Sequence, residues 1–346
     1  MQPLCRFFSV FFIIFFLLSQ NLFAQDVKSF DTAEKIKKFP VSGFIAFSVN
    51  TMIAESREYV CDYELILSDL KWPLTPSASY TIYGGVYFPK GIHLEGNISF
   101  MQPMSTAPMT DSDFEGIQAT PPQTGITKFS EHNCTIIGGL NWIAKLGLQL
   151  PMPQTAAMRS ARISVTVEPM LSCYYSTISW HSYGGYLQYA KMKFNGTYEP
   201  WIKTLPKVPH DGPAVSYQQN ILMPAIGIGV EVAFPHKLML VSDFHLTAKI
   251  MASAEDIHHD RNVRYVDIMN GGWAIHGNTR FSWNCLPFVS VFVNLFYQYC
   301  ITMEGNSAFY SGITSTKPSF YTPPNSAGTF LRGCTCSLGC AFVLGR

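Results

Sequence analysis

Charge is scarce in this sequence, and neither sign is concentrated in a run. Only 14% of the 346 residues are Asp, Glu, Lys or Arg, and the formal net charge is +1. Proteins that bind nucleic acid carry basic runs or patches that neutralise phosphates. The sequence has no basic run of that kind, so we expect no nucleic-acid partner.

Long apolar runs are missing after the first 24 residues. A transmembrane helix needs about 20 consecutive apolar residues, and no later stretch is that long and uninterrupted. Residues 1–24 have a different layout, because Arg6 precedes the apolar stretch FFSVFFIIFFLL and LFA stands directly before Gln25. This layout is typical of a secretory signal peptide, which we expect for residues 1–24. A retained membrane anchor is the alternative, and the shortness of the apolar run argues against it.

The cysteines lack the spacing of a zinc site. One of the nine, Cys5, lies in the expected signal peptide, which leaves eight. Cys334, Cys336 and Cys340 fall in the last predicted strand, where Cys334 and Cys336 share one face. We interpret them as small apolar residues of that strand, with a disulfide framework as the alternative. The sequence does not fix their redox state.

What the chain does have is a strict alternation of apolar and polar residues. In IHLEGNISF, residues 92–100, apolar side chains stand at positions 92, 94, 98 and 100. The same period recurs in residues 162–168, 225–234 and 237–249. A period of two predicts β-strands with one apolar and one polar face.

The polar face of these strands has a place inside a closed barrel. Residues 237–249 put Asp243, His245, Thr247 and Lys249 on one face and leucines and Phe244 on the other. Low charge with abundant Phe, Tyr and Gly suits a barrel whose outside faces lipid. A soluble β-sandwich is the alternative. The length of the strands and the signal peptide before them favour the membrane barrel.

Short and long connections alternate along the chain, as the turns and loops of outer-membrane barrels do. Tight, proline-containing turns at 87–92, 150–154, 233–238 and 284–289 separate longer polar stretches. We therefore expect an all-β fold for residues 41–346, a ten-stranded antiparallel transmembrane β-barrel, after a charged periplasmic lead at 25–40. The strands exceed the roughly 9–11 residues needed to cross a bilayer, so they extend above the outer membrane. The ten predicted strands are 42–56, 60–87, 91–108, 128–149, 158–181, 214–234, 237–254, 263–285, 288–303 and 328–346.

Two pairs of ionisable residues have the i, i+2 spacing that puts both side chains on one side of an extended segment. They are Asp111 with Asp113 and Asp256 with His258. The strand boundaries predict that both pairs lie in outer loops at the same end of the barrel. A His held by a carboxylate is a competent general base, and two close carboxylates can share a proton. Two facing pairs could therefore hold a water that attacks a peptide carbonyl.

These residues also have less specific interpretations. Asp in a loop is commonest as a solvated or turn-forming residue. His258, His259 and Asp260 look like a fragment of a metal site, but no matching His or Cys cluster occurs elsewhere in the sequence. The sequence alone does not decide among these interpretations.

Local motifs give the chain a family resemblance. With a ten-strand count around them, they make the chain resemble the omptins, ten-stranded outer-membrane proteases of bacteria, across nearly all of residues 25–346. The motifs are the D-x-D of MTDSDFEG, the D-x-H of SAEDIHH, and the stretches LSDLKW, SYQQNILMPAIGI and EGNSAFY.

The resemblance implies a mechanism without a metal or other cofactor. His258 would take a proton from water and Asp256 would orient the ring, while Asp111 and Asp113 would position the water or the developing oxyanion. Omptins prefer to cut beside basic residues, and Glu58 matches one of the acids that bind them.

Two positions depart from the family pattern. The second specificity acid is expected two residues before Asp256, where Ala254 stands. Omptins also depend on lipopolysaccharide held by basic residues of the outer wall, and Cys173 stands where such an Arg is expected. Preference for a basic residue and dependence on lipopolysaccharide are therefore less certain here than in the family.

The function that we expect is a surface-exposed endopeptidase of the bacterial outer membrane. Its active site would face the extracellular side, its substrates would be peptides or proteins, and its other partner would be outer-membrane lipid. One alternative is an inactive omptin-like barrel that serves as an adhesin or ligand-binding surface protein. A pore is disfavoured, since side chains such as Glu95, Asp243, His245 and Lys249 would fill a ten-stranded lumen.

Overall fold

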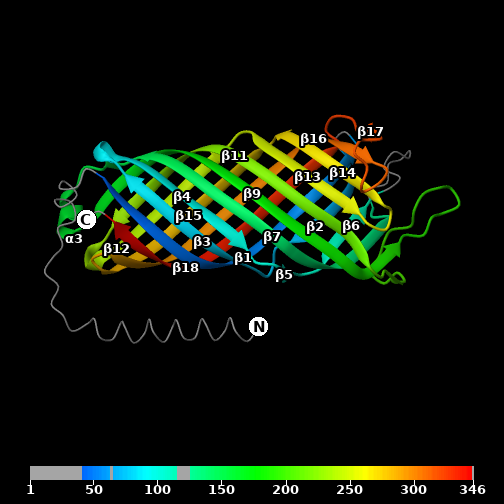
Figure 1. The fold of residues 1–346 in the computed structure, drawn as a ribbon, viewed down its shortest axis with the longest axis horizontal. Helices are drawn as coiled ribbons and strands as arrows, with labels where there is room; N and C mark the ends of the chain where they lie inside the picture. Colours follow the sequence, from blue (N-terminus) through cyan, green and yellow to red (C-terminus); the bar gives the residue numbers. More distant parts are fainter. Residues whose placement is uncertain (1–40, 63–64, 115–124, 345–346) are drawn as a thin grey trace. The chain divides into compact units, whose positions relative to one another are not determined.

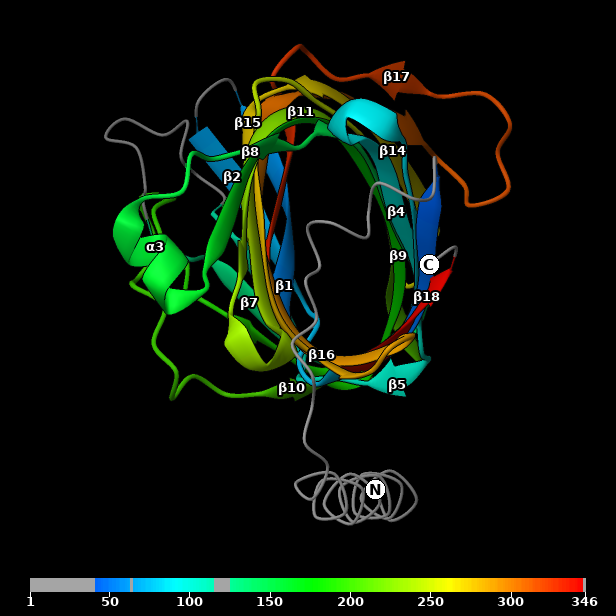
Figure 2. The same cartoon turned by 90° about the vertical axis from the view of Figure 1, so that its left-hand side faces the viewer.

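Strands form a closed ring in the computed structural model, which describes residues 41–62, 65–114 and 125–344. The chain crosses the ring ten times, each pass antiparallel to its neighbours, and pairing of β1 with β18 closes it. Figure 1 shows the passes side by side, and Figure 2 shows the ring from its end. The predicted ten-stranded barrel is confirmed. The signal peptide and lead predicted for 1–24 and 25–40 lie outside the described residues.

Several passes consist of more than one strand. The second is β2 and β3, the third is β4 to β6, the seventh is β12 and β13, and the eighth is β14 and β15. The strands are β1 (Ser42–Asp62), β2 (Leu65–Pro73), β3 (Ser77–Tyr87), β4 (Ile92–Met101), β5 (Met104–Ser105), β6 (Met109–Asp113), β7 (Lys128–Leu148), β8 (Leu150–Pro151), β9 (Ser164–Tyr189), β10 (Val208–Pro209), β11 (Pro213–Ala233), β12 (Leu238–Thr247), β13 (Ile250–His258), β14 (Val263–Gly271), β15 (Trp273–Leu286), β16 (Val289–Tyr310), β17 (Phe320–Tyr321) and β18 (Ala327–Leu344). Over the ranges that the structure describes, the helices are α3 (Ala156–Ala161) and the single 3-10 turns η2 (Pro89–Gly91) and η3 (Pro235–Lys237).

Three predicted boundaries were wrong in ways that matter. The fifth strand does not begin at 158, because residues 156–161 form α3, which the Thr155 side chain caps by accepting from the Met158 amide. The third and seventh passes run past their predicted ends to Asp113 and His258. The Asp111–Asp113 and Asp256–His258 pairs therefore lie in strands and not in loops. Because a strand fixes the direction of alternate side chains, both pairs are held more rigidly than loop residues would be.

A row of large apolar side chains runs around the outside of the barrel. Leu94, Leu146, Leu171, Ile226 and Leu246 are cross-strand neighbours in that order, and each is between 46% and 65% exposed. Such a continuous apolar surface fits the hydrocarbon of a bilayer. Among the described residues, no helix is long and apolar enough to span a membrane.

Polar side chains fill the lumen level with this apolar belt. Asp243 accepts a 2.5 Å hydrogen bond from Lys145 and lies 3.1 Å from His245 Nε2. Asp243, Lys145 and Glu95 are among the residues that line a cavity of about 110 Å³. The predicted inward direction of Asp243 and His245 is thus observed, and filling by side chains leaves little room for a pore.

Lys249 was predicted to share the lumen face, and that prediction is wrong. Lys249 and Ala248 lie exposed at the break between β12 and β13. From Leu246 to Met251 the chain makes five steps, while the facing residues Ile226 to Leu222 make four, so one residue is extra. This extra residue is a β-bulge, and it changes which side chains face inward, from odd-numbered ones in β12 to even-numbered ones in β13.

The cysteines are all free among the described residues. Cys334 and Cys336 lie on one face of β18, as predicted, and Cys336 is exposed on the outer wall. Cys340 is half-buried near the end of the same strand. None of the three is paired in a disulfide.

A charge placed in the apolar belt tests this assignment of the membrane zone. Ile226→Arg puts a cation among lipid tails, and we expect the free energy of unfolding to fall by about 2–4 kcal/mol in urea titrations of the barrel in bilayers. Gln218→Arg is the matched control, because Gln218 is exposed on the same face of β11, eight residues nearer the other rim. Equal losses from the two substitutions would contradict the placement of the belt.

Candidate active site

The two ionisable pairs lie at the same end of the barrel, on inward faces of β6 and β13. Asp111 and Asp256 are both buried, and their partners Asp113 and His258 point the same way two residues further along each strand. The charge of His258 lowers the pKa of Asp111, so the pairs lie within electrostatic reach of each other. The structure therefore brings together four residues that are up to 147 positions apart in the chain (111 to 258).

Asp256 and His258 form a tight hydrogen-bonded pair. His258 Nε2 lies 2.6 Å from Asp256 Oδ2, and Arg261 Nη2 contacts His258 Nδ1. A carboxylate accepts and a guanidinium donates, so both contacts assign the same neutral tautomer, with the proton on Nε2 and the lone pair on Nδ1. The nitrogen that can accept a further proton is thus Nδ1, on the side of Arg261.

Arg261 was not predicted to be near the site. It lies in the turn between β13 and β14, only three residues after His258. The charge-rich run HHDR was its only signal in the sequence. Alternation alone could not place it, because a turn does not have the two-residue period of a strand.

The second pair is asymmetric. Asp111 accepts a 2.9 Å hydrogen bond from Ser68 Oγ, whereas Asp113 forms a 3.3 Å ion pair with Lys128. Burial, followed by the charge of Asp113, raises the pKa of Asp111 to about 6. Asp111 therefore titrates near neutral pH, while Asp113 has a cationic partner.

Glu58 joins the site through the cross-strand register of three strands. Glu58 on β1 faces Leu70 on β2, and Leu70 in turn faces Asp111 on β6. The Glu58 side chain is only 2% exposed, and its Oε2 atom has no hydrogen-bond partner. Burial, and then the charges of Asp256 and other nearby carboxylates, raise the pKa of Glu58 well above its ordinary value. Glu58 thus presents an unsatisfied acceptor inside the site.

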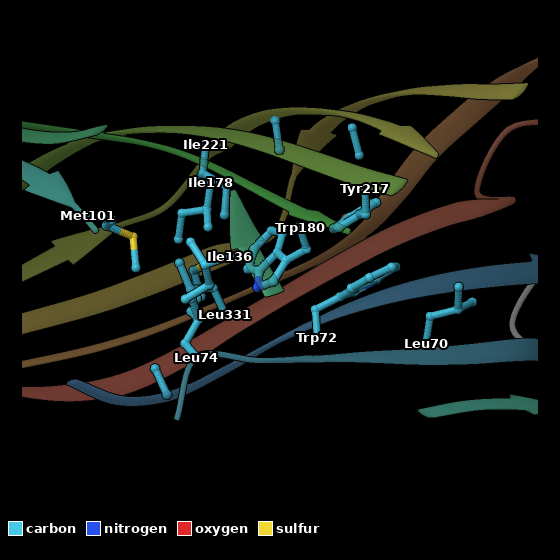
Figure 3. Close-up of a cluster of buried hydrophobic side chains, with 14 of the residues drawn as sticks. Leu70, Trp72, Leu74, Met101, Ile136, Ile178, Trp180, Tyr217, Ile221 and Leu331 are labelled. Atoms are coloured by element: carbon cyan, nitrogen blue, oxygen red, sulfur yellow. The ribbon is translucent and has the colours of Figure 1, made fainter. Parts of the chain in front are cut away.

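An apolar layer underlies the site and separates it from the polar lumen. Its aromatic members are Trp72, Trp180 and Tyr217, whose ring centroids lie 5.1 to 6.1 Å apart. Figure 3 shows these rings with the aliphatic side chains of the same layer, Leu70, Leu74, Ile136, Ile178, Ile221 and Leu331. An apolar floor removes water from the carboxylates above it, which disfavours their ionised forms. This layer accounts for the desolvation that raises the pKa of Asp111 and Glu58.

The fragment of a metal site suggested by His258, His259 and Asp260 is not assembled. His259 Nε2 lies 2.8 Å from the hydroxyl of Ser216, on the outer face of β11, and Asp260 is exposed in the following turn. His258 instead points into the barrel. Within the described ranges, no three His, Cys, Asp or Glu residues are grouped so that they could hold a metal ion.

Comparison with known proteins agrees with this architecture. The model of the Omptin family matches residues 41–344. The crystal structure of the outer-membrane protease OmpT from Escherichia coli is similar over 92% of this chain and 99% of OmpT, with a TM-score of 0.74 and 15% sequence identity. The translocator domain of the autotransporter NalP from Neisseria meningitidis has a TM-score of 0.33 and 7% identity over 94% of this chain and 92% of that domain. No curated protein sequence matches the chain significantly. At 15% identity, the similarity to OmpT shows the fold.

The raised pKa of Asp111 predicts a pH-dependent stability. The folded barrel holds this proton more tightly than the unfolded chain, whose carboxyl has the ordinary pKa of 3.8. The resulting stabilisation is fully present below pH 3.8 and is lost as the pH rises through about 6. Asp111→Asn should therefore raise the free energy of unfolding relative to the native protein at pH 8, by at most about 3 kcal/mol, and bring little gain at pH 3.5.

Urea titrations of the barrel in detergent at the two pH values measure this difference. Asp260→Asn is the control, because Asp260 is exposed and should give no pH-dependent gain. An equal gain from Asp111→Asn at both pH values would show that Asp111 is not held protonated by the fold.

Proposed function

The chain belongs to the omptin family of bacterial outer-membrane proteases, and we propose that it is a surface endopeptidase whose water is activated between Asp256–His258 and Asp111–Asp113. The observation that carries the proposal is the 2.6 Å contact of His258 with Asp256, within reach of a carboxyl whose pKa is raised. Hydrolysis near neutral pH requires a base that is unprotonated and an acid that is protonated in the same site, and groups whose environments push their pKa values apart can fill these two roles.

The dyad would supply the general base. His258 Nδ1 accepts a proton from water while Asp256 holds the Nε2 proton and stabilises the imidazolium that forms. The hydroxide oxygen bonds to the peptide carbonyl carbon. Because Arg261 contacts Nδ1 in the free protein, its guanidinium must move aside before a water can reach that nitrogen.

The carboxylate pair would act on the other side of the water. Asp111, protonated over part of the neutral range, donates a hydrogen bond to the oxyanion as the carbonyl oxygen gains charge. Asp113, held by its 3.3 Å ion pair with Lys128, would orient the water from beside Asp111. When the carbon–nitrogen bond breaks, the imidazolium returns its proton to the leaving amine, and both products are neutral at the reacting atoms.

The orientation of the site follows from strand number. Gly43 at the start of β1 pairs with Leu344 at the end of β18, so both ends of the barrel lie at one rim. Asp113 and His258 lie at strand ends on the opposite rim. In outer-membrane barrels with an even number of strands, the chain ends are periplasmic. The site would therefore face the extracellular side, where peptides and proteins are its substrates.

Cleavage of a mixed peptide library tests the proposal. The barrel is refolded in detergent with EDTA present, and cleaved peptides are identified by mass spectrometry. We expect the native protein to cut, and His258→Ala and Asp111→Asn to lower kcat/KM, for the first of them roughly 10²–10⁴-fold because the general base is lost. His259→Ala is the matched control and should retain native activity, since that ring bonds to Ser216 outside the barrel. A native barrel that cuts nothing, or variants that cut equally well, would contradict the proposal.

Lipopolysaccharide does not fit the wall position at which the family resemblance would place a cation. Cys173 lies there on the outer face of β9, and its cross-strand neighbours are Ala144 and Pro224, so no positive charge is available for a phosphate. We propose that catalysis does not depend on this lipid.

Cleavage rates with and without added lipopolysaccharide check this second proposal. We expect equal kcat/KM for the best library peptide in the two conditions, because phosphate has no unpaired cation to bind at this position. Cys173→Arg supplies one, and it should increase retention of the barrel on immobilised lipopolysaccharide. A strong dependence of the native protein on added lipid would overturn the proposal.

A further inference from the structure

Ala254 stands directly opposite an acidic residue. In the antiparallel pair of β13 and β14, Ala254 faces Asp267, and both side chains are on the inward face of the barrel. Residues paired across two antiparallel strands have their Cβ atoms about 4.5–5.5 Å apart. A carboxyl at 267 therefore reaches nearly the same space as a carboxyl at 254 would.

Small neighbours leave this carboxyl room. On one side of Asp267 lies the methyl group of Ala254, and on the other side, in β16, lies Ser307. Asp267 is 4% exposed and Ala254 is 2% exposed, so both are enclosed by the barrel wall. The small side chain at 254 thus leaves space beside the carboxyl at 267, and the carboxyl supplies the negative charge that Ala254 lacks.

Asp267 and Glu58 belong to one acidic cluster without a cation of its own. The charges of Asp256 and Asp267 raise the pKa of Glu58, and the charge of Asp256 also raises the pKa of Asp267. Burial is the main cause that raises the pKa of Asp267 to about 7. In the described part of the chain, no Lys or Arg forms an ion pair with either carboxyl. Buried carboxylates without a counter-ion cost stability.

Unsatisfied acceptors point to a ligand that donates hydrogen bonds. Glu58 Oε2 and Asp256 Oδ1 are both buried and both lack a hydrogen-bond partner. A guanidinium or ammonium group carries several N–H donors and a positive charge, so it would satisfy these atoms and the cluster charge together. The groups are not arranged to hold a metal ion.

We propose that Asp267, together with Glu58, binds the basic side chain next to the peptide bond that is cut. Asp267 acts as the specificity acid that is missing at Ala254, supplied from the neighbouring strand. This inference rests on the proposed protease function for its substrate, although the binding of a basic side chain can be measured without cleavage. The predicted preference is for Arg or Lys, despite Ala254.

Paired peptides that contain Arg or its neutral analogue citrulline at the cut position test the proposal. For the native barrel we expect kcat/KM to favour the Arg peptide. Asp267→Asn should lower the Arg-to-citrulline ratio roughly 10- to 100-fold, as expected for the loss of a buried hydrogen bond between charged groups. Adding Ala254→Asp to Asp267→Asn should recover most of the ratio, because the carboxyl returns to the same space from the opposite strand. A structural role of Asp267 alone would not give this recovery.

Glu255→Gln is the matched control for Asp267→Asn. Glu255 lies in the same segment as Ala254 but pairs with Arg264 at 3.1 Å outside the barrel, so its substitution should not change the ratio.

Calorimetric binding of both peptides to His258→Ala, with and without Asp267→Asn, follows recognition without cleavage and separates the two hypotheses. If the native barrel cuts nothing but Asp267→Asn abolishes the preference in binding, the protease proposal fails and this one holds. If cleavage occurs and Asp267→Asn leaves the ratio unchanged, this proposal is overturned and the protease proposal stands.

Discussion

The two-residue repeat of an extended chain determines which side chains of this barrel share the lumen, and the candidate site depends on it. Asp111 with Asp113 and Asp256 with His258 can act as pairs only because each pair has a spacing of two within a strand. The bulge at Ala248 is equally necessary. If alternation ran unbroken from β12 into β13, with no bulge, the even-numbered side chains of β13 would face the outer wall, and Asp256 and His258 with them.

Height along the barrel separates three environments. Apolar side chains outside and polar ones inside occupy the level of the membrane, and the aromatic layer around Trp72, Trp180 and Tyr217 closes the lumen above them. The acidic site lies on the far side of that layer, level with the outward ion pairs of Arg57. The apolar floor thus gives the site its desolvated carboxyls without burying it in the membrane zone. The apolar residues that fill the barrel at this level therefore also desolvate the carboxyls of the candidate site.

Much of the fold could be predicted from the sequence, because alternation and turn composition are local properties. The ten passes and the inward direction of Asp243 and His245 follow from them. The ends of the strands could not be predicted as well, since strand extension beyond the membrane is stabilised by pairing with a neighbour, as Asp111 is with Leu70. Local pattern also could not reveal the bulge, so Lys249 was placed on the wrong face.

The site was predictable only in part for the same reason. Spacing identified the two pairs, and family resemblance identified Glu58 and the absence of an acid at Ala254. Asp267 could not be found in this way, because its relation to Ala254 is set by the register of β13 against β14 and not by sequence distance. The position of Arg261 could not be predicted either, because Arg261 lies in a turn, where side chains do not alternate. The central claim is that these residues, from strands far apart in sequence, form one peptide-hydrolysing site. A crystal structure of His258→Ala with an uncleaved Arg-containing peptide tests it most directly. The account predicts that the scissile carbonyl lies between Asp111 and position 258, with the Arg side chain between Glu58 and Asp267. A peptide bound only to the outer loops, away from these carboxyls, would contradict it.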